Sequence, residues 1–145
     1  MRIKNYFILL ILSAAMSGTT MNAQSLKEYL WKNRLILLLA DEFEEEAVQN
    51  QLSLLLNASE GLDERDIKIL IVGRKEVFNI TKTVQTQLKP QEILTEFQIM
   101  PNFEGILLIG KDGTPKHQAE FPCNPAMLFD IIDSMPMRQA EMNKG

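Results

Sequence analysis

The sequence has few of the residues on which thiol and metal chemistry depend. Its 145 residues include one cysteine, Cys123, and one histidine, His117. A single cysteine cannot form an intramolecular disulfide, which excludes a dithiol oxidoreductase that cycles between a thiol pair and a disulfide. One histidine excludes a metal site built from several imidazoles. The sequence therefore argues against both a dithiol redox centre and a multi-histidine metal centre.

The sequence also lacks an apolar run long enough to span a bilayer. The longest run, residues 6–16, is shorter than the ~20 residues that a membrane-spanning helix needs. Arg2 and Lys4 precede this run, and a small, polar segment that ends at Ala23 follows it, which is the order of a secretory signal peptide. We therefore predict a signal peptide at residues 1–23, a mature domain at residues 24–145, and a periplasmic or secreted location. An uncleaved membrane anchor is the alternative.

An excess of basic residues is missing too. Fifteen Lys and Arg stand against nineteen Asp and Glu, and without the two basic residues of the predicted signal peptide the net charge of −4 becomes −6. An acidic chain does not favour binding to nucleic acid or to an anionic membrane. We expect neither partner for the mature protein, and no membrane attachment after cleavage.

The pattern of apolar runs predicts an α/β domain. Residues 34–40, 67–73 and 105–110 have the length and continuous apolar character of buried strands, and the apolar residues of 43–56 recur at helical spacing. Residues 57–66 read as a polar break. Pro90 opens a further helix, the sequence KDG at 111–113 predicts a hairpin turn into an edge strand with Pro115, and Asn124 caps a last helix before a polar tail. This order is that of a thioredoxin-like fold, a mixed β-sheet flanked by helices in a single domain with its core at about residues 34–135.

The junction between the first strand and the first helix is strongly acidic, with the sequence DEFEEE at residues 41–46. Asp41 is spaced correctly to be the N-cap of the helix, with Glu44 as its capping-box partner, and its loss would then cost about 1 kcal/mol of stability. The segment has no glycine, which a calcium loop needs, and acids on a helix point in different directions. We therefore predict a capped, solvated helix start and no metal site. Arg65, in the sequence LDERD, is expected to form a local ion pair.

Four stretches together resemble the thioredoxin-like "domain of unknown function 4174" family. These are RLILLLA at 34–40, LDERDIKILIVG at 62–73, LLIGKDG at 107–113 and LFDIIDSMPMRQAEM at 128–142. The resemblance implies the fold and an exported bacterial protein, with related domains in animal extracellular proteins that carry sushi repeats. A peroxiredoxin-like role has been suggested for the family by analogy of fold. In that fold the strand–helix junction carries the working cysteines and a proline precedes the third strand of this pattern, whereas residues 41–47 have no cysteine here and Gly105 lies near the place of the proline.

Cys123, in the sequence FPCNPAML, leaves two hypotheses open. A helix dipole lowers the pKa of a thiol at a helix start, but a lone cysteine beside a cap is also an ordinary small core residue. The sequence predicts an exported, non-catalytic module that binds an unknown protein or small molecule, with no catalytic residue, cofactor or metal. The alternatives are a single-cysteine, peroxidase-like thiol enzyme that uses Cys123, and a structural envelope protein. The segment MPMRQAEM at 135–142 is read either as a packed turn or as a contact surface for a partner.

Overall fold

The computed structural model describes residues 26–145, and the predicted signal peptide lies outside this range. Five strands form one mixed sheet in the order β3-β2-β1-β4-β5. They are β1 (Arg34–Leu39), β2 (Ile67–Val72), β3 (Val77–Asn79), β4 (Gly105–Ile109) and β5 (Pro115–Ala119). β1 pairs in parallel with β2, and the other neighbouring strands pair antiparallel. Pro115 lies on the edge strand β5, as predicted, since a proline cannot donate to a neighbouring strand.

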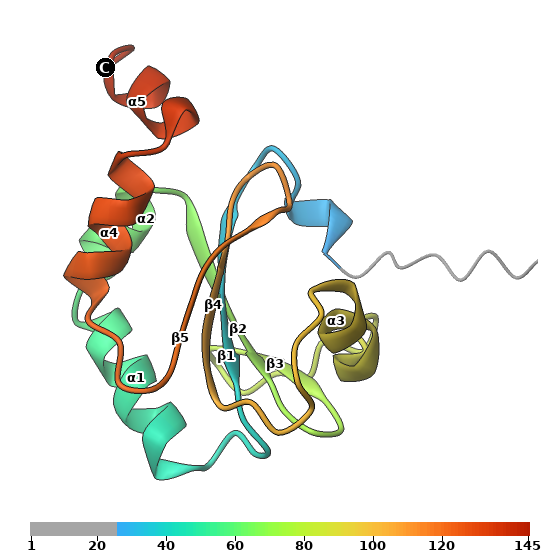
Figure 1. Ribbon diagram of the computed structural model, residues 1–145. Helices are drawn as coiled ribbons and strands as arrows, with labels where there is room; N and C mark the ends of the chain where they lie inside the picture. Colours follow the sequence, from blue (N-terminus) through green and yellow to red (C-terminus); the bar gives the residue numbers. More distant parts are fainter. Residues whose placement is uncertain (1–25) are drawn as a thin grey trace, which may run out of the picture.

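Helices cover both faces of the sheet. α1 (Glu46–Leu56), α2 (Ser59–Glu64) and α4 (Pro125–Asp133) lie on one face, α3 (Pro90–Glu96) lies on the other, and α5 (Pro136–Met142) continues beyond α4 (Figure 1). A short 3-10 turn, Lys27–Tyr29, precedes β1. The predicted mixed sheet flanked by helices is confirmed. Within residues 26–145, no helix is both long enough and apolar enough to cross a membrane.

The central strand β1 is buried on both faces of the sheet, which explains the continuous apolar run after Arg34. All six of its residues are buried, because helices pack on both faces of the sheet. Ile36 and Leu38 belong to the core beneath α1, α2 and α4, while Leu35, Leu37 and Leu39 belong to the core beneath α3. The alternation follows from the two-residue period of a strand. β1 is therefore the buried central strand of the sheet.

Two segments differ from the prediction. The expected polar break at 57–66 contains helix α2, and the expected polar tail after Pro136 forms helix α5. Ion pairs between distant segments hold both helices. Arg65, after α2, donates to Asp133 of α4 at 2.6 and 2.9 Å, and Arg138 of α5 donates to Asp133 at 3.1 Å and to Glu64 at 2.5 Å. Local sequence patterns do not contain these contacts, which is why the sequence predicted a break and a tail. The ion pair expected for Arg65 does form, chiefly with Asp133 rather than with a neighbour in sequence.

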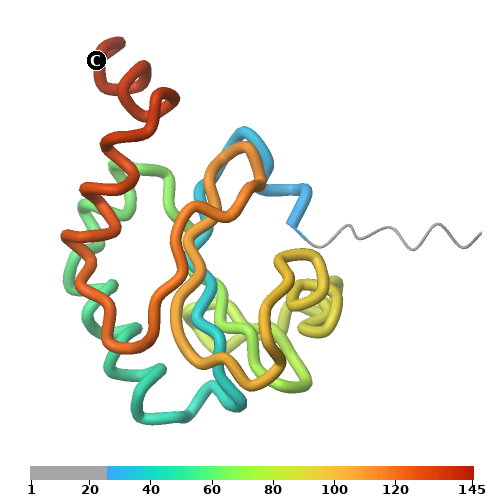
Figure 2. The backbone as a smooth tube through the Cα atoms, in the orientation of Figure 1, coloured from blue at the N-terminus to red at the C-terminus, as the bar shows by residue number. Residues whose placement is uncertain are grey.

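A second group of charges ties α5 to the start of β1. Arg34 is only 1% exposed, and its guanidinium donates to both carboxylate oxygens of Glu141 at 3.2 and 3.3 Å. Lys111, in the turn between β4 and β5, donates to the same carboxylate at 2.7 Å. The tube in Figure 2 shows this turn beside the segment that leads into β1. We call Arg34, Lys111 and Glu141 the α5 tie, because one carboxylate joins three elements.

The α5 tie and Asp133 predict acid-sensitive stability. Burial alone would raise the pKa of Glu141, but hydrogen bonds from Lys111 and Arg34 outweigh it and lower that pKa. The hydrogen bond from Arg65 lowers the pKa of Asp133. A carboxyl group whose pKa is lower in the folded state stabilises the fold above its unfolded pKa, and this stabilisation is lost as the pH falls through the folded value.

We therefore expect the free energy of unfolding to fall as the pH drops below about 4.5, the region of unperturbed Glu and Asp side chains. Urea unfolding at a series of pH values measures this. A double variant with Glu141→Gln and Asp133→Asn should be less stable at pH 7 and should show a shallower acid decline. An equally steep decline in that variant would mean that other carboxyl groups dominate.

Candidate functional site

The carboxyl ends of the parallel strands β1 and β2 open into a hollow of about 390 Å³, which we call the strand-end cleft. In open α/β sheets this end of the parallel strands is where ligands bind. The loop after β1 and the loop after β2 supply most of the lining side chains. Phe78 of β3 and Lys82, in the turn after β3, supply the remainder. The lining residues are Asp41, Glu42, Phe43, Glu44, Gly73, Arg74, Lys75, Glu76, Phe78 and Lys82.

Two aromatic rings form the apolar part of the cleft. Phe43 and Phe78 meet edge to face, with ring centroids 5.4 Å apart, and both pack against the core beneath α1. Edge-to-face pairs place the positive edge of one ring on the negative face of the other, which favours a fixed arrangement. The ammonium group of Lys82 lies 5.7 Å from the Phe43 ring centroid. The cleft therefore presents a well-supported aromatic surface with a cation at its border.

Two ion pairs flank this aromatic surface. Asp41 accepts hydrogen bonds from both Nε and Nη2 of Arg74, and Glu44 pairs with Lys82. The four side chains are between 45% and 69% exposed to solvent. Exposed pairs of this kind contribute about 0–1 kcal/mol, because water screens the charges. A ligand can therefore exchange with either pair at small free-energy cost.

The prediction that Asp41 caps the first helix is wrong. α1 begins at Glu46, five residues later, and no side chain caps it. Arg74 binds Asp41 through two charge-assisted hydrogen bonds, which are stronger than a single bond to a backbone amide. Instead, Glu45 closes the turn, because its Oε1 accepts the N–H of Glu42 at 2.8 Å. Residues 41–44 of the acidic segment thus form part of the cleft wall, and only Glu46 belongs to the helix.

This correction changes the expected effect of Asp41→Ala. With an exposed ion pair in place of a cap, the free energy of unfolding should change by less than ~0.5 kcal/mol. Chemical denaturation of the variant and of Arg74→Ala measures this, and the two changes should be similar. A loss of 1 kcal/mol or more in Asp41→Ala alone would restore the capping interpretation.

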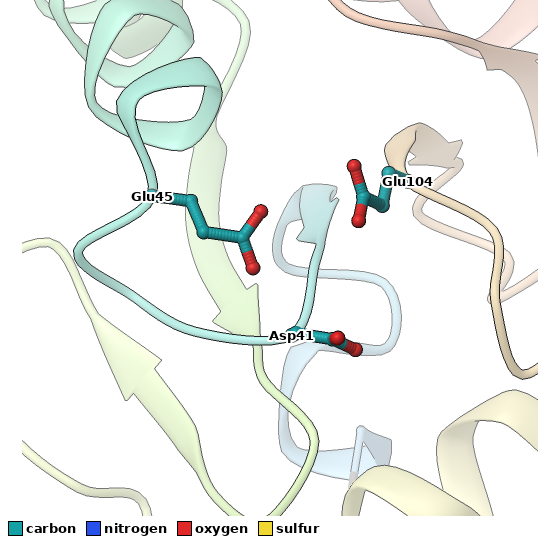
Figure 3. A group of neighbouring side chains, drawn as sticks. All are labelled: Asp41, Glu45 and Glu104. Atoms are coloured by element: carbon teal, nitrogen blue, oxygen red, sulfur yellow. The ribbon is translucent and has the colours of Figure 1, made fainter.

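Three carboxylates converge next to the cleft. Asp41, after β1, Glu45, before α1, and Glu104, before β4, face a common space (Figure 3), with one oxygen from each lying within 4.8 Å of the others. Two of the three are already engaged, since Arg74 holds Asp41 and the amide of Glu42 holds Glu45. The sequence predicts no metal site here, and we do not assign one to this group.

Cys123 lies in the core and is not one of the residues that line the cleft. It is 2% exposed and packs with residues of α1 and α4. The buried side chain of Gln51 brackets it: Nε2 donates to the Cys123 carbonyl at 2.8 Å, and the Cys123 N–H donates to Oε1 at 2.6 Å. Burial raises the pKa of the Cys123 thiol, opposite to the effect that a helix dipole would have. The thiolate, which is the reactive form, is therefore disfavoured.

The residues around Cys123 supply no catalytic partner in the described part of the chain. Asn124 caps α4, as predicted, by accepting the N–H of Ala126 at 2.9 Å. His117 lies on β5 opposite Leu108, and no hydrogen bond joins it to Cys123. His117 and Asn124 lie close to Cys123 in sequence, but no hydrogen bond joins the side chain of either to the thiol.

Gly105 begins β4 with φ at +157°, a backbone conformation that L side chains rarely adopt. A Cβ atom here would meet the carbonyl oxygen of Ala119 and the ring of Phe103. Proline holds φ near −65°, so it does not fit this conformation. Gly105, near the predicted place of the proline, therefore allows the backbones of β4 and β5 to approach each other closely.

Sequence reasoning missed Gln51, Arg74 and Phe78. Gln51 interrupts the otherwise apolar stripe of Val48, Leu52 and Leu55, and this interruption was the one available signal of a buried polar contact. Arg74 and Phe78 lie in the stretch from 74 to 88, which has no clear periodicity. The parallel pairing of β1 with β2 places Arg74 beside Asp41, and the pairing of β3 with β2 places Phe78 at the cleft.

Comparison with known proteins adds a family and a fold. The family described as "Domain of unknown function (DUF4174)" matches residues 25–141. A curated relative, the coiled-coil domain-containing protein 80 of Danio rerio, is 31% identical over 133 residues, which cover 81% of this chain. The chain spans only 15% of the length of that relative. The likeness therefore concerns one domain of a much longer protein.

Two solved structures share the fold. The reduced 2-Cys peroxiredoxin of Plasmodium vivax has a TM-score of 0.55 at 15% sequence identity, with 81% of this chain and 84% of that chain covered. Thioredoxin peroxidase I of Plasmodium yoelii has a TM-score of 0.53 at 15% identity, with 79% of each chain covered. At this identity the likeness shows the fold alone. The predicted thioredoxin-like fold is thus confirmed.

Proposed function

Because the chain belongs to the DUF4174 family, whose function is unknown, and has a thioredoxin-like fold, we propose that it is an exported, non-catalytic binding module. Its ligand, a protein or a small molecule, would occupy the strand-end cleft. One observation carries the proposal. At the junction where thioredoxin-like proteins carry their working cysteines, this chain has a cleft lined by Phe43 and Phe78, and its thiol is buried elsewhere.

The chemistry of the cleft supports binding. Ligand sites combine an apolar surface with a few polar groups that orient the ligand. Here the aromatic pair supplies the apolar surface, and the ion pairs of Asp41 with Arg74 and Glu44 with Lys82 supply the polar groups. Because these pairs are exposed, a charged ligand can replace either partner without leaving a buried charge unpaired.

Protein-observed NMR with a library of small molecules and short peptides tests this proposal. Bound compounds should shift the amide resonances of residues 41–44 and 73–78, and should leave those of α5 unchanged. Hits that all perturb other regions, or no hits at all, would contradict the proposed site.

A matched pair of variants sharpens the test. Lys75 lines the cleft, is exposed and has no ion pair in the described residues, so Lys75→Trp should block the cleft without loss of an ion pair. Lys68 is exposed on β2 but outside the cleft, and Lys68→Trp is the control. We expect Lys75→Trp to weaken binding at least about tenfold, the loss of some 1.4 kcal/mol, and Lys68→Trp to leave it unchanged.

The peroxidase-like alternative has its own experiment. A single-cysteine enzyme would consume peroxide, and Cys123→Ser would abolish that activity. The burial of Cys123 and the raised pKa of its thiol are unfavourable for such a reaction. Peroxide consumption that depends on Cys123 would replace the binding-module proposal with the enzyme.

Export is part of the proposal and rests on residues 1–23. Charged, apolar and small residues follow one another there in the order of a signal peptide. N-terminal sequencing of the exported protein should begin at or near Gln24. Full-length chain that stays in the cytosol would overturn the compartment.

A further inference from the structure

The strand-end cleft continues into two more hollows along the same end of the sheet. The second, of about 400 Å³, shares Asp41, Gly73 and Arg74 with the cleft. The third, of about 560 Å³, shares Asn102, Phe103 and Glu104 with the second. We call the three together the rim groove. Its residues lie around the carboxyl end of β1 and the start of β4. Figure 1 shows this end of the sheet opposite α5.

Each hollow of the rim groove has its own apolar surface. Phe43 and Phe78 line the first. Leu94 lines the second, and Phe103 lies between the second and the third. The third also contains Met100, which is 68% exposed. A large apolar side chain that is left in water beside aromatic residues is typical of a contact surface.

The polar residues of the rim groove are mostly acidic. Six acids and three bases line the three hollows, and two of the acids are paired with Arg74 and Lys82. Lys75 is the remaining base, and it has no ion pair in the described residues. The acids without an ion pair among these residues are Glu42, Glu76, Glu104 and Glu120. The rim groove therefore has an excess of negative charge around its apolar surfaces, which complements a cationic partner.

We propose that the rim groove binds a cationic peptide segment of a partner protein. Apolar side chains of the segment would occupy the successive hollows, and its lysine or arginine side chains would face the unpaired glutamates. Each hollow alone has the volume of a small-ligand site, so a row of three suits an extended chain better than one small cation. The inference rests on the proposed function and adds the class of ligand.

A synthetic peptide of alternating lysine and phenylalanine, labelled with fluorescein, is the probe. Anisotropy titrations should show binding in about 50 mM NaCl and about tenfold weaker binding in about 500 mM NaCl, because salt screens exposed charges. Two control peptides separate the contributions: glutamate replaces lysine in one, and serine replaces phenylalanine in the other. Both should bind at least about tenfold more weakly. Equal binding of all three peptides would overturn the proposal.

Two double variants locate the site. Glu104→Gln with Glu120→Gln removes two unpaired charges from the rim groove, and should weaken binding of the lysine–phenylalanine peptide about tenfold. Glu60→Gln with Asp63→Asn removes the same charge from α2, at the opposite end of the sheet, and should change binding less than about twofold. All four side chains are exposed, so both proteins should fold. An equal loss in both would mean that net charge alone attracts the peptide.

The outcomes separate this inference from the proposed function. One outcome is that the lysine–phenylalanine peptide fails to bind while the NMR screen finds ligands whose binding Lys75→Trp weakens. In that case the proposal of a cationic peptide is wrong and the proposal of a binding module stands. If the screen also finds nothing in the cleft, both are wrong.

Discussion

Replacement of Gln51 by leucine should lower the free energy of unfolding by about 3 kcal/mol. Gln51 is fully buried, and its amide accepts the N–H of Cys123 and donates to the carbonyl of Cys123. Leucine has a similar volume, so the variant leaves little cavity, but it leaves two buried backbone groups without partners. Each such group costs about 1–3 kcal/mol. Urea unfolding measures the loss, and Asn50→Leu, at an exposed neighbouring position on α1, should change stability by less than ~0.5 kcal/mol.

The same variant should change the accessibility of the thiol. In the wild-type protein Cys123 should react slowly with a thiol reagent while folded and rapidly once unfolded, because the buried thiol is shielded and its pKa is raised. If opening of the fold limits the reaction, a loss of about 3 kcal/mol should speed labelling by about a hundredfold. Rapid labelling of the native wild-type protein, with an apparent pKa well below ~8.5, would contradict a buried structural cysteine.

Replacement of Glu141 by glutamine should also cost about 3 kcal/mol at neutral pH. The substitution removes the negative charge that faces Arg34, whose guanidinium is almost fully buried. Lys111 keeps its pairing with Asp66, so the unpaired charge falls on Arg34. Removal of one partner from a buried pair costs about 3–5 kcal/mol, and we expect the lower end because Glu141 is 27% exposed.

A double-mutant cycle tests the source of this loss. Arg34→Met should be less harmful in the Glu141→Gln background than in the wild-type protein, since the buried charge is then removed with its partner. Strictly additive effects of the two substitutions would mean that the α5 tie does not couple them. As a further control, the exposed pair of Asp41 and Arg74 should show a coupling of less than ~1 kcal/mol.

Much of the fold could be predicted because its signals are local. The buried strands are continuous apolar runs, the turn at 111–113 has turn residues, and Asn124 followed by Pro125 begins α4. The failures share one physical cause. Asp41 binds a residue 33 positions away, and Arg34 binds one 107 positions away, so neither pairing leaves a trace in sequence spacing. Local rules therefore assigned Asp41 to a cap and residues after Pro136 to a tail.

Only part of the candidate site could be predicted from the sequence, for the same reason. The acidic junction at 41–46 was recognised from the sequence, although its role was misassigned. Arg74, Phe78 and Lys82 complete the cleft from the next loop and hairpin, where the sequence has no periodic pattern. The parallel pairing of β1 with β2 places both loops at one edge of the sheet. The aromatic pair of Phe43 and Phe78 is consequently a tertiary feature that no single stretch encodes.

The α5 tie and the rim groove lie at opposite ends of β1. Arg34 is its first residue and Leu39 its last, a separation of about 17 Å along the strand. Substitutions that far apart, with no shared partner, combine almost additively. If the rim groove binds a ligand as we propose, substitutions there can therefore change the ligand with little effect on the α5 tie. In the binding module that we propose, the residues that contact the ligand and the residues that anchor α5 are therefore different sets.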